Sequence, residues 1–387
     1  YFINSKVESN SVPFGSILEE TREKTVIENE DTLLSCAING IYRNDELFSH
    51  FRGSSNIGYI KIKKNDLVLS AQNLHLGNAN VNLRFEHGII SPAYKAYRVI
   101  GAVPEYMAQW VKRPQANQFF LDATTEGASQ CRKNIDWDTL YAQNIQLPSI
   151  EIQEKIATLL SSVDTKIKVE KIKVEKLKAI KKSMLGKMFP KEGASVPEIR
   201  FKGFTDDWEQ RKFSDIATRE SSVCTSASDT PSVEYEDVVA EEGRLNKDIR
   251  SKEVVKTGIT FDGSQVLYGK LRPYLHNWLN PDFKGIAVGD WWVLKPVNMD
   301  KNFLYRLIQT QQFDNIANQS SGSKMPRADW NLISSSEFMV PLSKEEQSKI
   351  GAYFDQLDHL ITLHQRKYEK LLDVKKAFLE KLIGGDN

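Results

Sequence analysis

The sequence predicts an α+β protein with a pseudo-two-fold repeat, in which two globular lobes are joined by two long helices. The first observation is a self-match: the stretch around 149–189 repeats around 343–383 with an offset of 194 residues, which places Gln153 on Gln347. The second is that each helical stretch follows a segment in which short β-type runs alternate with turn residues. The 387 residues thus divide into two halves, each long enough to bury its own core.

Apolar residues recur in both helical stretches at alternate steps of three and four, which is the seam along which two helices pack. Polar residues interrupt both seams at the same two steps, with Glu170 and His364 at the first and Lys181 and Lys375 at the second. We interpret them as side chains that snorkel at a helix end, with fixing of register as the alternative. The seam residues assigned to helix pairing and to docking of a partner are Ile156, Val163, Ile167, Leu177, Ile350, Leu357, Ile361 and Leu371.

The ends of the helices carry local signals. Pro148 stands just before the first helix, where a proline costs little because the first amides have no helical partner. Ser343 and Glu346 form a predicted capping box at the start of the second helix, and Gly384-Gly385 a predicted stop at its end. Segment 190–197, with proline and glycine, is expected to be a surface linker.

Charge and cysteine content restrict the class of protein. The net charge is +1, from 52 basic and 51 acidic residues, so composition by itself does not indicate a nucleic-acid binder. Cys36, Cys131 and Cys224 lie far apart, which argues against a zinc site or a disulfide framework and for a reducing, cytoplasmic compartment. The sequence shows no signal peptide and no apolar run of membrane-spanning length, and it begins at Tyr1 without a methionine.

Each lobe is expected to hold a small sheet and one helix. In the first lobe we predict strands at 58–63 and 67–70 and a helix over 105–120. In the second lobe we predict strands near 253–259, 265–268 and 291–294 and a helix over 300–318. The predicted domains are a first lobe at 1–148, a first helix at 149–189, a linker with the second lobe at 190–342, and a second helix at 343–387.

The two lobes resemble each other in sequence only where they end. Asp136-Trp137 precedes the first helix as Asp329-Trp330 precedes the second, and a polar, basic loop precedes each pair, at 126–133 and 320–327. Unlike lobes on like helices are expected if the helices form a shared frame and the lobes recognise two different things.

The sequence contains several near-matches to catalytic and cofactor-binding motifs, and each one fails on a required residue or spacing. Gly263 to Leu271 has the wrong glycine spacing for a phosphate loop, and Leu271 stands where Ser or Thr binds magnesium. Asn280-Pro-Asp-Phe departs from a methyltransferase motif at Asp282, and no acidic-x-lysine triplet follows at a useful distance to complete a nuclease site. The histidines are scattered. We therefore expect a non-catalytic binding protein without a metal ion.

Motifs in the helices and at the start of the second lobe resemble a known family. Gln153-Glu-Lys-Ile and Gln347-Ser-Lys-Ile stand near the helix starts, after Pro148 and Pro341, and residues 196–212 read Val-Pro-Glu-Ile-Arg-Phe-Lys-Gly-Phe-Thr-Asp-Asp-Trp-Glu-Gln-Arg-Lys. These motifs are similar to those of the DNA specificity (S) subunit of type I restriction-modification systems, where the last one leads into a target recognition domain. The first lobe lacks this lead-in and begins near Val12-Pro-Phe-Gly-Ser-Ile, so we expect truncation or divergence at its start.

The resemblance implies a DNA-recognition subunit, without catalysis of its own, in a DNA methyltransferase/endonuclease complex. The lobes would be two target recognition domains, each reading one half of a bipartite site in double-stranded DNA. The helices would pair as an antiparallel coiled coil and dock two methyltransferase (M) subunits, through which restriction and translocation (R) subunits join. S-adenosylmethionine, ATP and Mg are then expected on the partner subunits, and no cofactor on this chain.

The helix length fits such a task. A helix of about 38 residues is about 57 Å long, whereas half-sites on one face of DNA lie about 34–36 Å apart. The predicted target is therefore two short specified segments separated by several unread base pairs.

Base edges in the major groove are read by arginine, lysine, asparagine and glutamine side chains on exposed loops. The loops that end at Arg132 and Arg327 are favoured because they recur at the same place, and Arg327→Ala is expected to weaken reading of the second half-site alone. For any one candidate, a solvated or structural charge is the commoner alternative. The candidates are Arg84, Gln130, Arg132 and Lys133 in the first lobe and Lys270, Arg272, Lys324 and Arg327 in the second.

Two other classes of protein stay open. One is a non-enzymatic coiled-coil scaffold whose lobes bind protein, which predicts no DNA binding even with methyltransferase partners present. The other is a nuclease or methyltransferase, which requires a metal or cofactor motif that the sequence does not show.

Overall fold

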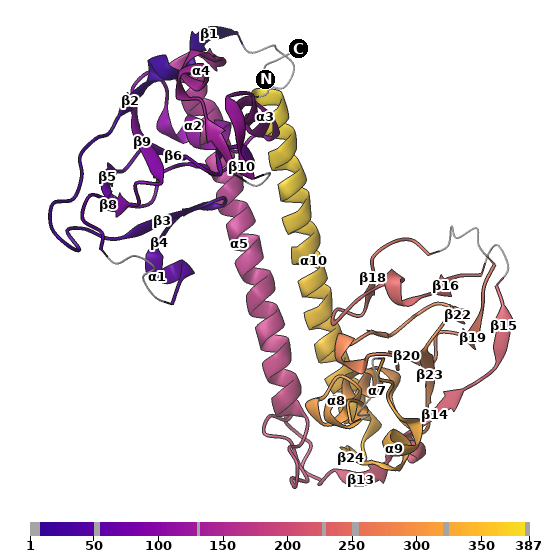
Figure 1. The fold of residues 1–387 in the computed structure, drawn as a ribbon. Coiled ribbons are helices and arrows are strands. Elements are labelled where there is room, and N and C mark those ends of the chain that lie inside the picture. The colour runs from indigo at the N-terminus through magenta and orange to yellow at the C-terminus, as the bar shows by residue number, and fades with distance from the viewer. Residues whose placement is uncertain are drawn as a thin grey trace. The chain divides into compact units, whose positions relative to one another are not determined.

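The computed structural model describes residues 8–49, 55–129, 132–226, 230–249, 255–319 and 325–383, without the side chains of 126–129 and 132. Its contacts divide the chain into two units, each with one lobe: unit 1 contains Tyr1–Glu170 and Lys367–Asn387, and unit 2 contains Lys171–Arg366. The two long helices are α5 (Ile150–Met188) and α10 (Lys344–Leu382), and each contributes one end to each unit (Figure 1). The seam therefore predicts both helices correctly, whereas the predicted stop at Gly384-Gly385 lies outside the described residues.

The lobe of unit 1 is built on a four-stranded antiparallel sheet in the order β2-β9-β6-β7. Every residue of β6 is buried, as expected of a short apolar run at the centre of a sheet. Four two-stranded pairs accompany this sheet: β1 with β12, β3 with β4, β5 with β8, and β10 with β11. The strands are β1 Ser9–Pro13, β2 Leu18–Glu20, β3 Leu34–Ala37, β4 Gly40–Arg43, β5 Ile60–Lys63, β6 Asp66–Ser70, β7 Ala79–Val81, β8 His87–Ile90, β9 Tyr94–Val99, β10 Thr124–Ser129, β11 Arg132–Ile135 and β12 Asn144–Pro148.

The single helix predicted over 105–120 is wrong, because the structure has two helices there. Pro114 occupies the first turn of the second helix, where its missing N–H costs nothing, whereas inside one continuous helix it would remove a hydrogen bond and clash with the preceding turn. The helical elements of the lobe are η1 Phe14–Ile17, α1 Asn44–Leu47, η2 Leu74–Leu76, α2 Pro104–Trp110, α3 Pro114–Asp122 and α4 Trp137–Ala142.

The lobe of unit 2 has a four-stranded sheet in the order β14-β23-β20-β21 and a second one in the order β15-β19-β22-β16. Two short pairs, β13 with β24 and β17 with β18, complete it. The strands predicted near 265–268 and 291–294 are confirmed as β20 and β23, and the one near 253–259 corresponds to β19. The strands are β13 Glu209–Lys212, β14 Ala217–Glu220, β15 Val223–Thr225, β16 Ser232–Val233, β17 Val238–Val239, β18 Arg244–Leu245, β19 Thr257–Phe261, β20 Val266–Gly269, β21 Trp278–Leu279, β22 Gly285–Ala287, β23 Trp291–Pro296 and β24 Glu337–Val340.

The helix predicted over 300–318 is also two helices. Thr310 ends the first by donating its hydroxyl to the carbonyl of Leu307 at 2.7 Å, and it caps the second by accepting from the amide of Phe313 at 3.4 Å. Threonine side chains compete for backbone partners in this way, which separates the two helices without a proline. The helical elements are α6 Phe213–Ile216, η3 Tyr235–Asp237, η4 Pro273–Leu275, α7 Lys301–Leu307, α8 Gln311–Ala317 and α9 Trp330–Ser335.

The two lobes share a scaffold although their sequences differ. The order β2-β9-β6-β7 in unit 1 corresponds strand for strand to β14-β23-β20-β21 in unit 2, and in both lobes two short helices follow this sheet. Even single backbone bonds recur: the amide of Ala71 donates to the carbonyl of Ala93 at 3.0 Å, and that of Lys270 donates to Asp290 at 2.9 Å. The lobes therefore share one order of strands and helices, as the predicted pseudo-two-fold repeat requires, although their sequences resemble each other only where the lobes end.

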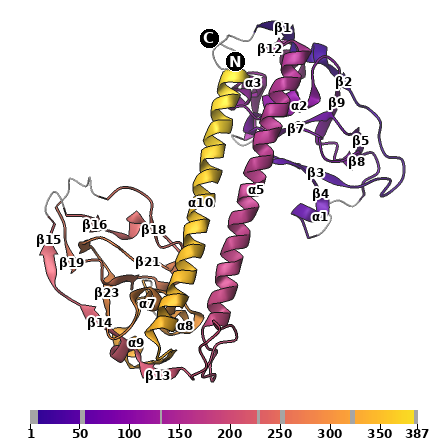
Figure 2. The same cartoon turned by 180° about the vertical axis from the view of Figure 1, so that it is seen from behind.

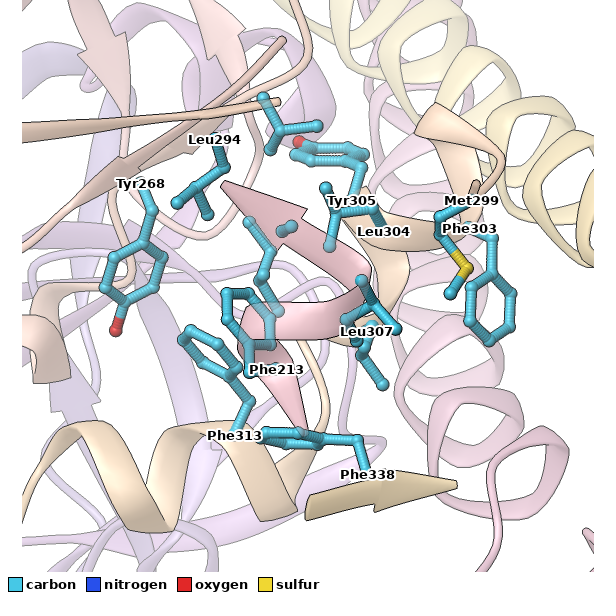
Figure 3. Packing of buried hydrophobic residues seen from close by; sticks show 14 of the residues in the cluster. Phe213, Tyr268, Leu294, Met299, Phe303, Leu304, Tyr305, Leu307, Phe313 and Phe338 are labelled. Carbon is cyan, nitrogen blue, oxygen red and sulfur yellow. The ribbon is translucent and has the colours of Figure 1, made fainter. Parts of the chain in front are cut away.

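The core of each lobe is closed by the start of one long helix and the end of the other. In unit 2, the start of α10 buries Ile350 and Phe354 in the same cluster as Met188 at the end of α5. Figure 3 shows the aromatic part of that cluster, in which the rings of Phe213, Phe313 and Phe338 gather beside α7 residues. In unit 1, the start of α5 and the end of α10 close the core in the same manner, through Ile156, Ala157, Leu160, Leu379, Leu382 and Ile383.

Within each unit the two long helices run antiparallel. In unit 1, Asp164 of α5 pairs with Lys375 of α10, and six residues further along α5 Glu170 pairs with Lys367, so residue numbers rise on one helix as they fall on the other. Both views show the two helices side by side (Figures 1 and 2). The predicted fold class is thus confirmed: an α+β protein with two lobes on a duplicated, antiparallel helix pair.

The described residues show no structural sign of a membrane span or a metal site. None of their helices combines the length and the apolar character that crossing a membrane requires. No three His, Cys, Asp or Glu side chains among them are grouped so that they could hold a metal ion. Cys36 is a buried thiol and Cys224 an exposed one, whereas Cys131 lies outside the described residues.

Candidate nucleic-acid interface and its helical frame

A buried glutamine near the start of each long helix connects the helix to its lobe. Gln153 accepts a hydrogen bond from the amide of Val103 at 2.9 Å and donates to the carbonyl of the proline before α5 at 2.8 Å. Gln347 accepts from the amide of Asp300 at 2.7 Å and donates to the corresponding proline before α10 at 2.8 Å. Because Val103 and Asp300 are the N-cap residues of α2 and α7, each glutamine fixes the start of a lobe helix to a long helix.

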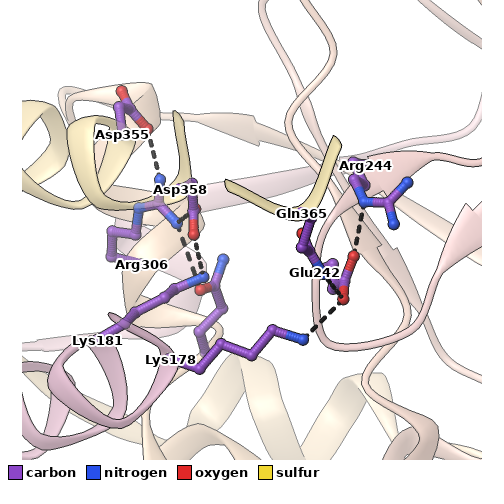
Figure 4. Close-up of polar contacts among 9 residues, drawn as sticks. Lys178, Lys181, Glu242, Arg244, Arg306, Asp355, Asp358 and Gln365 are labelled. Atoms are coloured by element: carbon purple, nitrogen blue, oxygen red, sulfur yellow. Dashed lines mark hydrogen bonds and ion pairs between the residues drawn. The ribbon is translucent and has the colours of Figure 1, made fainter. Parts of the chain in front are cut away.

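A cluster of charges around the buried Arg306 joins both long helices to the lobe in unit 2 (Figure 4). Arg306 of α7 has a side chain only 1% exposed and contacts Asp358 at 2.6 Å and Asp355. Lys181 of α5 pairs with the same Asp358 at 2.7 Å. Burial lowers the pKa of Lys181 against the opposing effect of Asp358.

Unit 1 repeats this arrangement with one residue changed. Asp164 pairs with Lys375 at 2.6 Å and accepts from the amide nitrogen of Gln109 at 3.0 Å. Gln109 therefore takes the place in the first lobe that Arg306 takes in the second. The interpretation that the polar seam residues snorkel at a helix end is wrong for Lys181, Lys375 and Glu170, because each pairs with another side chain within its unit.

A second polar contact in unit 2 involves Glu242, in the loop between β17 and β18. Its carboxylate accepts from Lys178 of α5 at 2.9 Å, from Gln365 of α10 at 2.7 Å and from Arg244 at 2.6 Å (Figure 4). Burial opposes ionisation of Glu242, but these three hydrogen bonds outweigh it and hold its pKa below the usual value. One lobe residue thus contacts both helices.

Exchanging the charges of the pair in unit 1 is expected to be tolerated. Lys375→Glu alone places two carboxylates together and should destabilise unit 1 by about 1–2 kcal/mol. Adding Asp164→Lys should recover most of this loss, because Gln109 can turn its amide and offer its oxygen to a lysine. Urea unfolding of the full chain, with hydrogen exchange of the α2 amides, measures both effects.

The same exchange in unit 2 is the matched control. Lys181→Glu with Asp358→Lys should not recover stability, because Arg306 cannot accept a hydrogen bond and would face a second cation. Equal recovery in both units would contradict this assignment of partners.

The lead-in at 196–212 is held on the start of α10. Arg200 binds the carboxylate of Glu346 with two hydrogen bonds of 2.7 and 2.8 Å, and Trp208 donates its indole N–H to the same group at 3.3 Å. Ser343 accepts from the amide of Glu346 at 3.3 Å as predicted. The glutamate half of the predicted capping box is wrong, because the carboxylate of Glu346 points to Arg200, a charged partner that binds it more strongly than a backbone amide.

The Asp-Trp pairs at the lobe ends also have a local structural role. Asp136 accepts from the amide of Thr139 at 3.2 Å and Asp329 from that of Asn331 at 2.8 Å, so the two aspartates cap α4 and α9. These caps fix the starts of the two short helices that precede the last strand of each lobe.

In the second lobe, the structure brings three of the four predicted DNA-contacting residues together. Arg327 donates from Nη2 and Nε to the carboxylate of Asp290 at 3.0 and 3.3 Å, and Lys270 approaches the same carboxylate at 3.5 Å. Arg272 lies two residues after Lys270, and its amide donates to the carbonyl of Pro326 at 2.7 Å. The cluster stands where β20 ends and β23 begins, and the fourth candidate, Lys324, lies outside the described residues.

Arg272 has a backbone conformation that is unusual for a residue with a side chain. Its φ is +49°, in the left-handed region, and Pro273 follows it at the start of η4. Within the part of the chain that the structure describes, its buried Nε–H has no hydrogen-bond partner. Strain and an orphaned donor on one basic residue are features of functional sites, which agrees with its prediction as a DNA contact.

Of the first-lobe candidates, the structure describes Arg84, Lys133 and the backbone of Arg132. Arg84 follows β7 and makes two hydrogen bonds, of 2.8 and 2.6 Å, with Glu46 of α1. Arg132 and Lys133 lie on β11, which pairs with β10, and the side chain of Lys133 is half-buried. Gln130 lies outside the described residues. Contact of all eight candidates with DNA stays a prediction.

The seam residues occupy two environments. Burial is complete or nearly so for five of them, with exposed fractions from 2% to 8%, and the other three are half-buried. Their role in docking a partner stays a prediction. The buried ones are Ile156, Val163, Ile350, Leu357 and Ile361, and the half-buried ones are Ile167, Leu177 and Leu371.

Comparison with known proteins was made at the level of sequence and of fold. The family model described as the type I restriction modification DNA specificity domain matches residues 205–373. No sequence among the curated proteins matched the chain.

Solved structures agree in fold over the whole length. The crystal structure of a type I restriction-modification system S subunit from M. genitalium matches with a TM-score of 0.64 and 13% identity, over 98% of this chain and 97% of that one. A structure reported for complex assembly and conformational transition of the type I R-M system matches with a TM-score of 0.52 and 14% identity, over 99% of this chain and 100% of that one. The resemblance to type I specificity subunits predicted from the helices and the lead-in is confirmed.

Proposed function

We propose that the chain is the sequence-specific DNA-recognition subunit of a type I restriction-modification complex. Each lobe reads one half of a bipartite site in double-stranded DNA, and the long helices dock methyltransferase subunits. The observation that carries the proposal is the match of residues 205–373 to a DNA specificity domain, in a second lobe where three predicted DNA-contacting residues, Lys270, Arg272 and Arg327, lie together.

The shared lobe scaffold supports reading of two different half-sites. The backbone bond that joins Ala71 to Ala93 in the first lobe joins Lys270 to Asp290 in the second. At these two positions the shared lobe scaffold thus carries alanine methyl groups in the first lobe and a lysine and an aspartate in the second. Direct readout of bases depends on such side chains, so two lobes with one backbone can recognise unrelated sequences.

Exposed apolar side chains on the long helices support docking of partner subunits. Val169 of α5 in unit 1 is 44% exposed, and Leu363 of α10 in unit 2, its equivalent by the repeat, is 52% exposed. Exposed apolar patches, rather than single residues, mark surfaces that a protein partner covers, and the two helices expose Leu159, Ile172, Ile180, Leu360 and Leu372 as well. S-adenosylmethionine, ATP and Mg belong to the methyltransferase and restriction subunits in this proposal, and this chain is a non-catalytic, cytoplasmic protein that binds none of them.

Sequencing of methylated bases tests the proposal. Genomic DNA from cells that carry the chain with its methyltransferase partner should show methylation at two short specified segments separated by unread base pairs. A single continuous specified site would contradict bipartite reading. If the purified complex does not bind DNA at all, the chain is the protein-binding scaffold.

A further inference from the structure

Resting on the function proposed above, we propose that Arg327 reads a guanine in the second half-site and that Asp290 is the residue that positions it. Asp290 itself is a positioning residue, because it acts through Arg327. The sequence predicts that Arg327 contacts DNA. What is new is the base that Arg327 reads and the residue that positions its guanidinium.

The contacts of Arg327 leave one edge of its guanidinium available. A guanidinium has five N–H donors arranged on planar edges. Asp290 accepts from Nε and from Nη2, so the edge formed by Nη1 and Nη2 still carries two roughly parallel N–H groups. The side chain of Arg327 is 54% exposed, and among the described residues its side-chain hydrogen bonds go to Asp290 from Nε and Nη2.

Two parallel donors select guanine among the four bases. In the major groove guanine offers two neighbouring acceptors, N7 and O6, and a bidentate arginine satisfies both. Adenine places an amino donor beside N7, which would face an N–H of the arginine, and thymine offers a single acceptor. When an N–H of the arginine faces an N–H of the wrong base, both donors are buried without an acceptor. This costs free energy, and the cost is what distinguishes guanine from the other bases.

The backbone of Asp290 is fixed in position by its neighbours. Its carbonyl accepts from the hydroxyl of Tyr235 at 2.5 Å and from the amide of Lys270 at 2.9 Å. Gly289 before it has a φ of +98°, which favours glycine, and Trp291 after it is 1% exposed. The hydrogen bonds from Arg327 hold the pKa of Asp290 below its usual value, so the carboxylate is charged at neutral pH.

The backbone around Arg327 is fixed as well. Arg327 forms an isolated antiparallel bridge with Leu271, and on either side the amide of Arg272 donates to Pro326 at 2.7 Å and that of Ala328 to Lys270 at 2.8 Å. Both partners of the Arg327–Asp290 pair are therefore built on paired backbone. Such support keeps a recognition group within the narrow geometry that base reading requires.

The first lobe cannot read a base in this way at the corresponding place. Ala93 stands where Asp290 stands in the second lobe, and Ala71 stands where Lys270 stands. Neither methyl group can hold an arginine. We therefore expect this guanine reading in the second half-site only.

The test uses the complex of the full chain with its methyltransferase subunits, purified from the cells that produce it. Once sequencing of methylated bases has given the motif, binding is measured to duplexes that carry each base pair in turn at each position of the second half-site. Arg327→Lys and Arg327→Ala should reduce discrimination at one G·C pair on the order of 10- to 100-fold. Asp290→Asn should give a smaller loss at the same pair, and Asp290→Glu should restore part of it.

The matched control is Arg211→Ala, which removes an exposed arginine paired with Glu209 at 2.7 Å elsewhere in the same lobe. It should leave discrimination at every position unchanged, as should all four variants at the first half-site. Because the readout is a ratio at one base pair, general destabilisation does not imitate it.

Loss of discrimination at an A·T pair, equal loss at all positions of the second half-site, or no loss in either Arg327 variant would overturn the proposal while bipartite reading stands. Unchanged discrimination in Asp290→Asn would overturn the positioning role. If the complex with the unaltered chain shows no bipartite motif, the proposed function itself fails, which is a different result.

Discussion

Replacing Arg306 by leucine should destabilise unit 2 by about 2 kcal/mol, because it removes the buried cation from an ion-pair cluster whose carboxylates, on Asp355 and Asp358, are 40% and 24% exposed. The guanidinium is 1% exposed and joins α7 to Asp355 and Asp358 on α10. Without it, Lys181 is the one cation left to pair with Asp358 in the described residues. The loss is expected to exceed that of any surface substitution, which is usually within about 0.5 kcal/mol.

The first lobe supplies the matched control for this change. Gln109 holds Asp164 there with a single hydrogen bond of 3.0 Å. Arg306→Gln should therefore keep one bond to Asp358 and lose less stability than Arg306→Leu. Urea unfolding of the full chain gives the overall loss, and hydrogen exchange shows whether it is confined to unit 2. An Arg306→Leu chain that is as stable as the Gln variant would contradict the role of the buried charge.

Replacing Glu346 by alanine should destabilise unit 2 by about 3–5 kcal/mol. The side chain of Glu346 is 2% exposed and that of Arg200 is 15% exposed, so the substitution leaves an unpaired guanidinium and an unpaired indole N–H with little access to water. The lead-in from 196 to 208 should then detach from α10 before the rest of the lobe unfolds. Hydrogen exchange of the Trp208 amide, which donates to Ser195 at 3.0 Å, reports this detachment.

Two further variants separate the charge from the packing. Glu346→Gln keeps the shape and one acceptor, and it should lose clearly less than alanine. In the double variant Glu346→Leu with Arg200→Met no buried charge is left unpaired, so it should recover part of the loss, and the double-mutant cycle measures the coupling. Additive effects of the two single changes would show that the ion pair does not hold the lead-in.

Local signals predicted the frame well. The three-four seam identified α5 and α10 to within a residue or two of their observed ends, because the period of a helix is written in consecutive residues. Strands such as β6, β20 and β23 were visible as short apolar runs for the same reason. Pro114 marks the break between α2 and α3 in the sequence itself, and the prediction of one helix overlooked it. The break between α7 and α8 depends on the hydrogen bonds that the Thr310 hydroxyl makes with the backbone, which the sequence does not show.

The candidate site was predicted in part. Lys270, Arg272 and Arg327 were identified as basic residues in loops, and the structure places them together. Asp290 was missed, because an acidic residue does not stand out in a search for DNA contacts. Arg84 looked equivalent in sequence, but it makes a bidentate pair with Glu46, which lies 38 residues earlier in the chain.

By itself the sequence determined that this protein is a duplication, with two helices of one seam carrying two lobes and with matched Asp164/Asp358 and Lys181/Lys375 positions. Only the tertiary structure decided that these acids and lysines pair with each other, that the lobes share one sheet order, and that Asp290 holds Arg327. The physical reason is the distance along the chain over which each interaction acts. Helix period and turn chemistry act between neighbours in the chain, whereas the partner of a buried charge is chosen by packing that brings distant segments together.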